Sequence, residues 1–148
     1  MADVTRLKSN SLIEGRSSYS RGIAIGEWIV LANTAGRNFS TREMPADATG
    51  QAEQMFRNIE GALAALGSKL ADVVRARVSV PDPADMPAVM AVFAARFAGI
   101  EPVGTFTCTP LAGPEYKVEM EVTAYRGAGD VAAKEVTCLL YTSPSPRD

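Results

Sequence analysis

The feature that most constrains the fold is a change of hydrophobic periodicity in the middle of the chain. Between Ala48 and Leu66 apolar residues recur every three or four positions, the spacing of one face of a helix. Asp47 can cap the start of this helix and Gly67 can end it. The next segment, LADVVRARVSV, returns to the alternation of a strand and is closed by two prolines. A helix that leads into a strand in this way predicts helices packed on a sheet.

Other segments complete a β-β-α-β-α-β-β order. RGIAI and WIVLAN flank Gly26-Glu27, a plausible hairpin turn, and the second strand is apolar on both sides, so we expect it to be buried on both faces. A second helix is expected to start at Asp85 and to end near residue 98. GTFTCTP and KVEMEVTAY supply the last two strands.

The predicted strands carry polar residues on one side. In LADVVRARVSV, alternation puts Val73 with Arg75, Arg77 and Ser79 on a half-exposed face. In the same way Thr105 and Thr107 share one face of GTFTCTP, and Glu119 and Glu121 share one face of KVEMEVTAY. The polar side of the three predicted strands therefore carries Val73, Arg75, Arg77 and Ser79, then Thr105 and Thr107, and then Glu119 and Glu121.

Two helices can cover only one face of such a sheet. The polar face must therefore meet water or another subunit. The two glutamates either lie on a solvated surface or line a pocket, and the alternation alone leaves both possibilities open.

Composition narrows the chemistry. The chain has 148 residues, which suits one domain, and a net charge of −2 with scattered basic residues, which argues against a nucleic-acid surface. It has no histidine, which removes histidine-dependent triads and most zinc sites, and only two cysteines, which cannot form a disulfide framework. The N-terminal residues do not form a secretory signal and no apolar run is long enough to span a membrane, so we expect a cytoplasmic protein.

The last eleven residues, CLLYTSPSPRD, differ from everything before them. They resemble the translation of a transposase-type sequencing adapter, which favours a single domain over residues 1–137, a non-native tail over 138–148 and a truncated native C-terminus. The alternative is a natural disordered tail rich in proline and serine.

Several segments in order resemble the RidA/YjgF family of reactive intermediate (enamine/imine) deaminases: SSYSRGI, GEWIVLANTAG, QAEQMFRNIEGALAALGSKLADVVRARVSV, MAVFAARF and YKVEMEVTAY. The resemblance spans about residues 10 to 126. It implies an α+β, chorismate-mutase-like fold with two helices on one face of a mixed sheet. It also implies a homotrimer with ligand pockets between adjacent subunits, and neither a metal nor an organic cofactor.

The resemblance further implies hydrolysis of 2-imino or enamine acids to 2-oxo acids and ammonia. Glu121 matches the pocket glutamate, as general base or water-positioning group, and Tyr19 matches a tyrosine that shapes the site. The chain departs from the family pattern in three places. Gly104 replaces the arginine that binds the substrate carboxylate, Met90 replaces a pocket asparagine, and Ala32-Asn33-Thr34 replaces Ser-Gly-Gln after the buried strand. We therefore expect a hydrolase or deaminase with altered specificity.

The remaining candidates line the expected pocket. With catalytic Glu121, the expected substrate-binding residues are Tyr19, Asn33, Gly104, Thr105 and Cys108. Arg37 is either a replacement for the missing cation or, as we favour, a solvated loop residue, and Cys108 is either a nucleophile or, as we favour, a small buried thiol. The alternative function is a non-catalytic ligand-binding or regulatory trimer; neither nucleic acid nor membrane is expected as a partner.

Overall fold

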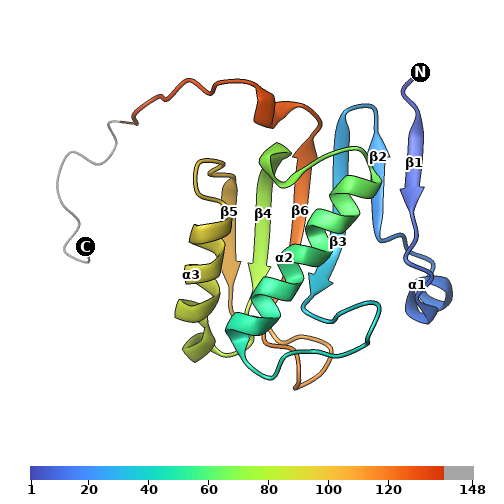
Figure 1. Ribbon diagram of the computed structural model, residues 1–148, viewed down its shortest axis with the longest axis vertical. Coiled ribbons are helices and arrows are strands. Elements are labelled where there is room, and N and C mark those ends of the chain that lie inside the picture. Colours follow the sequence, from blue (N-terminus) through green and yellow to red (C-terminus); the bar gives the residue numbers. More distant parts are fainter. Residues whose placement is uncertain (139–148) are drawn as a thin grey trace.

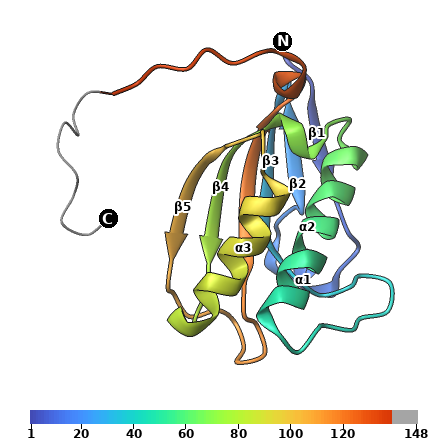
Figure 2. The same cartoon turned by 60° about the vertical axis from the view of Figure 1, so that its left-hand side comes forward.

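The computed structural model describes residues 1–138, which form one sheet with two helices packed on one of its faces (Figures 1 and 2). The strands are β1 (Val4–Leu7), β2 (Gly22–Ile25), β3 (Trp28–Ala35), β4 (Val73–Ser79), β5 (Val103–Thr107) and β6 (Glu119–Tyr125). The helices are α1 (Leu12–Ser17), α2 (Ala48–Ala65) and α3 (Met86–Arg96), with short 3₁₀ turns at Leu70–Asp72, Pro83–Asp85 and Ala128–Asp130.

The order of the strands in the sheet is β1-β2-β3-β6-β4-β5. β4 and β5 are parallel and the other neighbouring strands are antiparallel, so the sheet is mixed. The last strand, β6, lies between β3 and β4, and the two glutamates of β6 are therefore in the middle of the sheet. This confirms the predicted α+β architecture.

The core fills the space between the sheet and helices α2 and α3. Phe56 of α2 lies edge to face against Phe97, with ring centroids 5.2 Å apart, and Phe93 of α3 packs on Phe106 of β5 at 4.9 Å. Burying each of these side chains contributes about 1.5–3 kcal/mol. Such packing fixes β5 and β6, and therefore also fixes the polar face on the other side of the sheet.

Local signals for the hairpin and for α2 are confirmed. Ile25 pairs with Trp28 across a two-residue turn in which Gly26 has a φ of +56°. α2 ends where Gly67 takes a φ of +73°, a conformation that glycine adopts without strain. Asp47 and Asp85 stand at the N-cap positions of α2 and α3, but neither carboxylate accepts a capping hydrogen bond, so the predicted caps are wrong in that detail.

Other expectations at the level of single strands are wrong. Val73 is buried in the core, because an irregularity in the β4–β6 pairing between Val73 and Arg75 breaks the strict alternation. β3 is buried on only one face of the single chain, with Ile29 and Leu31 in the core and Trp28 and Val30 about half exposed. β1 and α1 were not predicted, because neither segment has an apolar pattern long enough to show a period.

Apart from Cys138, the predicted non-native tail lies outside the described residues, so that prediction stays as it was. No helix within residues 1–138 is both long enough and apolar enough to cross a membrane.

Candidate functional site

The sheet face opposite α2 and α3 is divided into an apolar part and a polar part. Exposed apolar side chains lie on the β2–β3 side, and Trp28 makes an edge-to-face contact with Tyr125 at 5.0 Å. Polar side chains cover the other part, where Glu121 of β6 is opposite Arg77 of β4, and Arg77 in turn is opposite Thr105 of β5. The polar part contains most of the residues singled out in the sequence.

A cavity of about 420 Å³ lies where β3, β6 and the segment after α1 meet. Its polar lining side chains include Tyr19, Arg21, Asn33, Arg37 and Glu119. It is within the size range of small-molecule sites in proteins. The cavity therefore brings the guanidinium groups of Arg21, Arg37 and Arg42 and one carboxylate together around a space that a small metabolite can fill.

Glu119 is the carboxylate of this cavity. Burial raises its pKa above the ordinary value for glutamate, while the positive charge of Arg21 and a hydrogen bond from Asn33 act in the opposite direction. The Asn33 side-chain nitrogen donates to Oε2 of Glu119 over 2.6 Å. A carboxyl group with a raised pKa, held by one donor, is suited to accept and return a proton.

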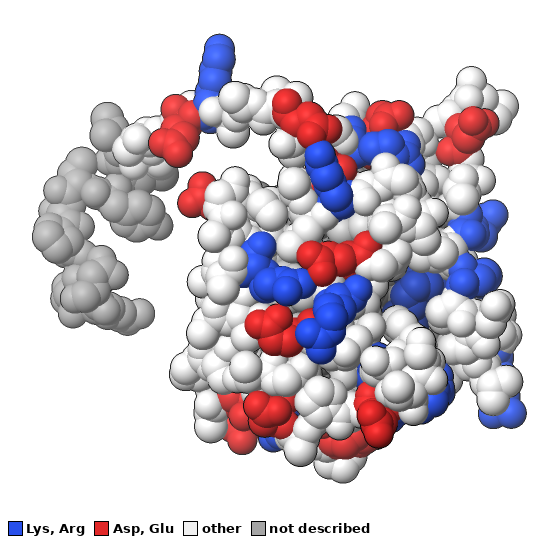
Figure 3. Space-filling view, in the orientation of Figure 1, with Lys and Arg blue, Asp and Glu red and all other residues white. Residues whose placement is uncertain are grey.

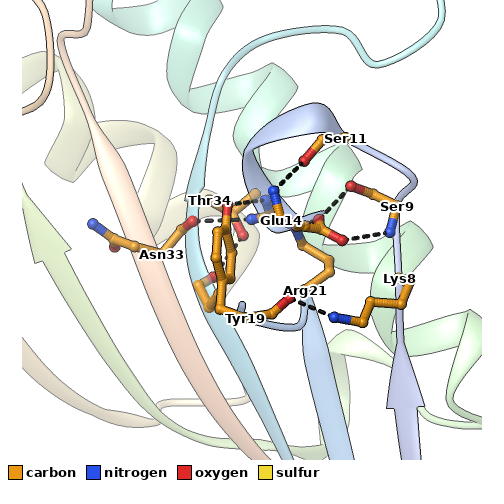
Figure 4. A network of polar contacts seen from close by, with 9 residues as sticks. Lys8, Ser9, Ser11, Glu14, Tyr19, Arg21, Asn33 and Thr34 are labelled. Carbon is orange, nitrogen blue, oxygen red and sulfur yellow. Dashed lines mark hydrogen bonds and ion pairs between the residues drawn. The ribbon is translucent and has the colours of Figure 1, made fainter. Parts of the chain in front are cut away.

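Arg21 is held in place by a network around helix α1 (Figure 4). Its Nε atom lies 3.3 Å from Oε1 of Glu14, a carboxylate that is only 2% exposed, and its NH1 group donates to the backbone oxygen of Asn33 over 3.1 Å. Although burial acts to raise the pKa of Glu14, hydrogen bonds from Ser9 and the charge of Arg21 hold it below the ordinary value. Glu14 is therefore an ionised anchor for Arg21.

The guanidinium of Arg21 also lies between two aromatic rings. Its central carbon is 5.9 Å from the ring centre of Tyr19 and 5.8 Å from that of Phe39, distances at which a cation is attracted to a ring face. The anchored side chain is thus fixed in position before any ligand arrives, which lowers the entropic cost of binding.

Arg37 is a second cation on the wall of the cavity. It lies over the ring of Tyr116 at 5.9 Å, donates to the backbone oxygen of Arg42, and approaches Glu115 at 3.8 Å. Glu115 is half exposed, so this long ion pair is weak. Arg37 lines the cavity that holds Glu119, and its role as a replacement cation or as a solvated loop residue stays a prediction.

Glu121 lines a neighbouring hollow of about 260 Å³ together with Arg77, Thr105, Thr107 and Asn33. Nε of Arg77 is 3.4 Å from Oε1 of Glu121, and both side chains are about half exposed. Asn33 also lines the first cavity, so it stands between the two glutamates.

Comparisons with known proteins show the family and the fold. The sequence model of the family described as "Endoribonuclease L-PSP" matches residues 9–126. A Mycobacterium tuberculosis member of the YjgF/YER057c/UK114 family has a crystal structure that superposes with a TM-score of 0.75 at 36% identity, covering 83% of this chain and 99% of that one. The chain belongs to the RidA/YjgF family.

Relatives of this RidA/YjgF chain include enzymes of known name. The 2-iminobutanoate/2-iminopropanoate deaminase of Escherichia coli is 33% identical over 113 residues, which are 73% of this chain and 87% of the relative. The crystal structure of RidA from the Antarctic bacterium Psychrobacter sp. is 29% identical with a TM-score of 0.69, and covers 73% of this chain and 88% of that one.

The structure of this RidA/YjgF member brings four predicted site residues into two adjoining hollows. Tyr19 and Asn33 line the larger one, and Asn33, Thr105 and Glu121 line the smaller one. Their roles in binding or catalysis stay predictions.

Gly104 and Cys108 lie elsewhere. A Cβ atom on Gly104 would come within 2.9 Å of the Phe106 ring, so a side chain there would leave the sheet on the α3 side, away from Thr105. Cys108 is exposed just after the end of β5 and lines neither hollow. The preferred expectation of a buried thiol is wrong for the single chain, because the strand pairing ends at Thr107 and the chain turns away from the core.

Sequence reasoning missed the roles of Arg21 and Glu14, and it passed over Glu119 in favour of Glu121. Arg21 follows Tyr19 by two positions in SYSRG, so it lies near the tyrosine, which is the one local signal for it. Nothing in the pattern indicates that Glu14 is buried. Within residues 1–138 no group of three or more acidic, cysteine or histidine side chains is placed to hold a metal ion.

Proposed function

We propose that this protein is a hydrolase of small imines or enamines, and that its substrate binds in the cavity formed by Tyr19, Arg21, Asn33, Arg37 and Glu119. One observation carries the proposal: a carboxylate with a raised pKa, hydrogen-bonded to Asn33, faces the same cavity as two arginines. Membership of the RidA/YjgF family and the E. coli relative named 2-iminobutanoate/2-iminopropanoate deaminase support it.

The reaction needs one group that moves protons. Water adds to the carbon of the protonated C=N bond as the carboxylate takes one proton from the water, and a neutral carbinolamine forms. The carboxyl group then returns that proton to nitrogen, the C–N bond breaks and ammonia leaves. The carboxylate takes the hydroxyl proton as the C=O bond forms, and a ketone is released. An enamine enters the same route after protonation at its β-carbon. A carboxyl group whose pKa is raised is well placed for both steps.

The arginines select an anionic substrate. Position 104 has no side chain here, so the substrate carboxylate needs another cation. Arg21 is anchored by Glu14 and Arg37 has only a long contact with Glu115, which leaves N–H donors on both for a ligand. A planar carboxylate suits the guanidinium fork. We therefore infer that this member binds its anionic substrates through other arginines, and hence with altered specificity.

Two carboxylates compete for the role of general base. Glu121 is the residue that the family resemblance indicates, and it remains a proposed catalytic residue with Thr105 beside it. Glu119 has the environment that acid–base work requires, since it is partly buried and bonded to Asn33. We therefore propose Glu119 as the proton-transfer group and Glu121, beside it, as a water-positioning group.

We further propose that three copies assemble through the sheet face that bears these glutamates, in the cytoplasm. The exposed apolar residues on the β2–β3 side of that face support the assembly, since a water-exposed strip of this kind needs a cover. Those residues are Ile25, Trp28, Val30 and Tyr125. A partner there would also close the two hollows from solvent.

The test is ammonia release from a panel of freshly generated imines and enamines, both anionic and neutral. Glu119→Gln and Glu121→Gln are the matched variants, since each keeps the size of the side chain and removes its charge. We expect Glu119→Gln to lower kcat at least about 100-fold, and Glu121→Gln to lower it less. Full activity in both variants would rule out the proposed chemistry.

The alternative is a trimer that binds a small ligand without catalysis. The absence of a side chain at Gly104 favours it, because the usual cation for the substrate carboxylate is missing there. Absence of ammonia release from every compound, together with binding of 2-oxo acids that is lost in Arg21→Gln, would favour this alternative.

A further inference from the structure

A third cavity, of about 370 Å³, lies on the helical side of the sheet between α2 and the segment that joins β1 to α1. We call it the outer groove; its lining includes Lys8, Phe39, Arg57 and Gly61. Arg21 and Phe39 line it and also line the cavity around Glu119, which we call the inner cavity.

The charges of the outer groove have one sign. Lys8, Arg21 and Arg57 line it and no acidic residue does. Arg21 is paired with Glu14, but neither Lys8 nor Arg57 takes part in an ion pair found within residues 1–138. In Figure 3 blue side chains predominate over the right-hand part of this face, where β1 and α1 lie. The groove therefore carries uncompensated positive charge.

Both cations are oriented by neutral groups. Nζ of Lys8 donates to the backbone oxygen of Tyr19 over 2.6 Å, and the Arg57 guanidinium donates to Oε1 of Gln54 over 3.0 and 3.2 Å. These contacts hold the side chains in place without neutralising them, so N–H donors are left for an anion.

Part of the groove is an apolar surface on α2. Three of the six α2 residues that line it are small, namely Gly61, Ala62 and Ala65, and at Gly61 a Cβ atom would meet nothing within 4 Å. Glycine is unfavourable by about 1 kcal/mol inside a helix, and at this position it leaves open space above the helix. Phe39, about half exposed, supplies an aromatic ring at the side of the groove. A planar ring fits between Phe39 and the glycine better than a branched chain does.

We propose that the outer groove is a binding site for a small aromatic anion, whose charged group contacts Lys8 and Arg57 and whose ring lies over Gly61 beside Phe39. The site does not depend on the proposed hydrolase activity, because it lies on the other side of the sheet from Glu119 and Glu121. The positive charges of Lys8 and Arg57 favour an anion, and the open surface at Gly61 favours an aromatic ring on that anion.

The test uses three probes on the full chain: phenyl phosphate, inorganic phosphate and phenol. Binding is followed by chemical shifts of backbone amides. We expect phenyl phosphate to bind and to shift the amides of Gly61, Ala62 and Ala65, with affinity at least about tenfold above that of either fragment probe. Shifts confined to Tyr116 and Glu119 would instead place the ligand in the inner cavity and overturn the proposal.

Variants at one position separate loss of the site from loss of fold. Gly61→Ala and Gly61→Leu should both stabilise the helix, but only the leucine fills the groove, so only Gly61→Leu should abolish binding. Arg57→Gln should weaken phenyl phosphate about tenfold, as expected on losing a charge-assisted contact. Equal binding by the wild type and Gly61→Leu would show that the groove is not the site.

Discussion

The side-chain amide of Asn33 donates a hydrogen bond of 2.6 Å to the carboxylate of Glu119, and the same asparagine lines the hollow that contains Glu121. Asn33 lies within an irregularity in the pairing of β3 with β6, between Leu31 and Thr34, and its amide reaches the β6 carboxylate. The side chain of Asn33 thus affects the pKa of Glu119 and also lies beside Glu121.

Replacing Asn33 by alanine should move the acidic limb of the pH–rate profile to higher pH. The hydrogen bond from Asn33 favours the ionised form of Glu119 and partly offsets the effect of burial on its pKa. Loss of this hydrogen bond should therefore raise the pKa of Glu119 further. The measurement is kcat/KM for imine hydrolysis as a function of pH.

Asn33→Asp is not a suitable control, because it adds a charge. Asn38→Ala, in the loop after β3, is the matched control and should leave the profile unchanged. An unshifted profile in Asn33→Ala would contradict a proton-transfer role for Glu119.

Glu119→Gln should make the protein more stable at pH 7 but not at pH 3. The folded state raises the pKa of Glu119, so its contribution to stability is fully present below the unfolded-state pKa and is lost as pH rises through the folded-state pKa. Glutamine does not ionise, so the variant avoids that loss of stability. Its side-chain oxygen can still accept the hydrogen bond from Asn33. Urea denaturation at both pH values checks this, and equal differences between variant and wild type at the two values would refute it.

Glu14→Gln should destabilise the protein by about 2–4 kcal/mol at neutral pH, because it leaves the largely buried Arg21 without its counter-charge. The folded state lowers the pKa of Glu14, so the stabilisation is present above the unfolded-state pKa and is lost as pH falls through the folded-state pKa. The difference from wild type should therefore shrink in acid. Glu43→Gln, in an exposed loop, is the control for removal of a carboxylate, and its effect should stay within about 0.5 kcal/mol.

Val30→Glu should convert the assembly into monomers that keep their fold. Val30 is 48% exposed in the single chain, so a carboxylate there is hydrated in the monomer, but it would be desolvated at a subunit boundary. Light scattering after size-exclusion chromatography gives the mass. Ala64→Glu, on the exposed side of α2, should leave the oligomer intact. A wild-type protein that is already monomeric would remove the proposed trimer altogether.

Gly104→Arg should raise turnover of anionic imines no more than Gly104→Ala does, because a side chain at this position leaves the sheet on the α3 side, away from Thr105 and the two hollows. Any side chain there requires the Phe106 ring to shift, so Gly104→Ala is the control for that strain. Steady-state kinetics on a matched pair of charged and uncharged imines gives the comparison. A gain of about tenfold with arginine alone, as expected for one added charge-assisted contact, would show instead that the new guanidinium reaches the substrate carboxylate.

Long periodic segments of this chain could be predicted from sequence, and short or irregular ones could not. The α2 stripe and the KVEMEVTAY alternation each extend over enough residues to define a period, and both are confirmed. β1 has four residues and α1 has six, too few for a period to appear. Val73 was placed on the wrong face because the pairing irregularity beside it has no local sequence signal.

The candidate site shows a similar division. The family resemblance indicated Tyr19 and Glu121, and with them Asn33 and Thr105 as lining residues; these four side chains line two adjoining hollows. The choice of Arg21 needed tertiary information, because its position depends on the ion pair with Glu14 of a helix that the sequence does not reveal. The difference between Glu119 and Glu121 is one of burial, which alternation on the same strand face cannot show.

Arg21 and Phe39 line both the inner cavity and the outer groove, so one guanidinium forms a common wall between them. A ligand that accepts hydrogen bonds from Arg21 in one of these cavities leaves fewer Arg21 donors for a ligand in the other. Equilibrium linkage then requires each occupant to change the affinity of the other by the same factor. An aromatic anion bound outside would thus act as an effector of whatever is held beside Glu119, and a change in the KM of the imine substrate upon addition of phenyl phosphate would reveal it.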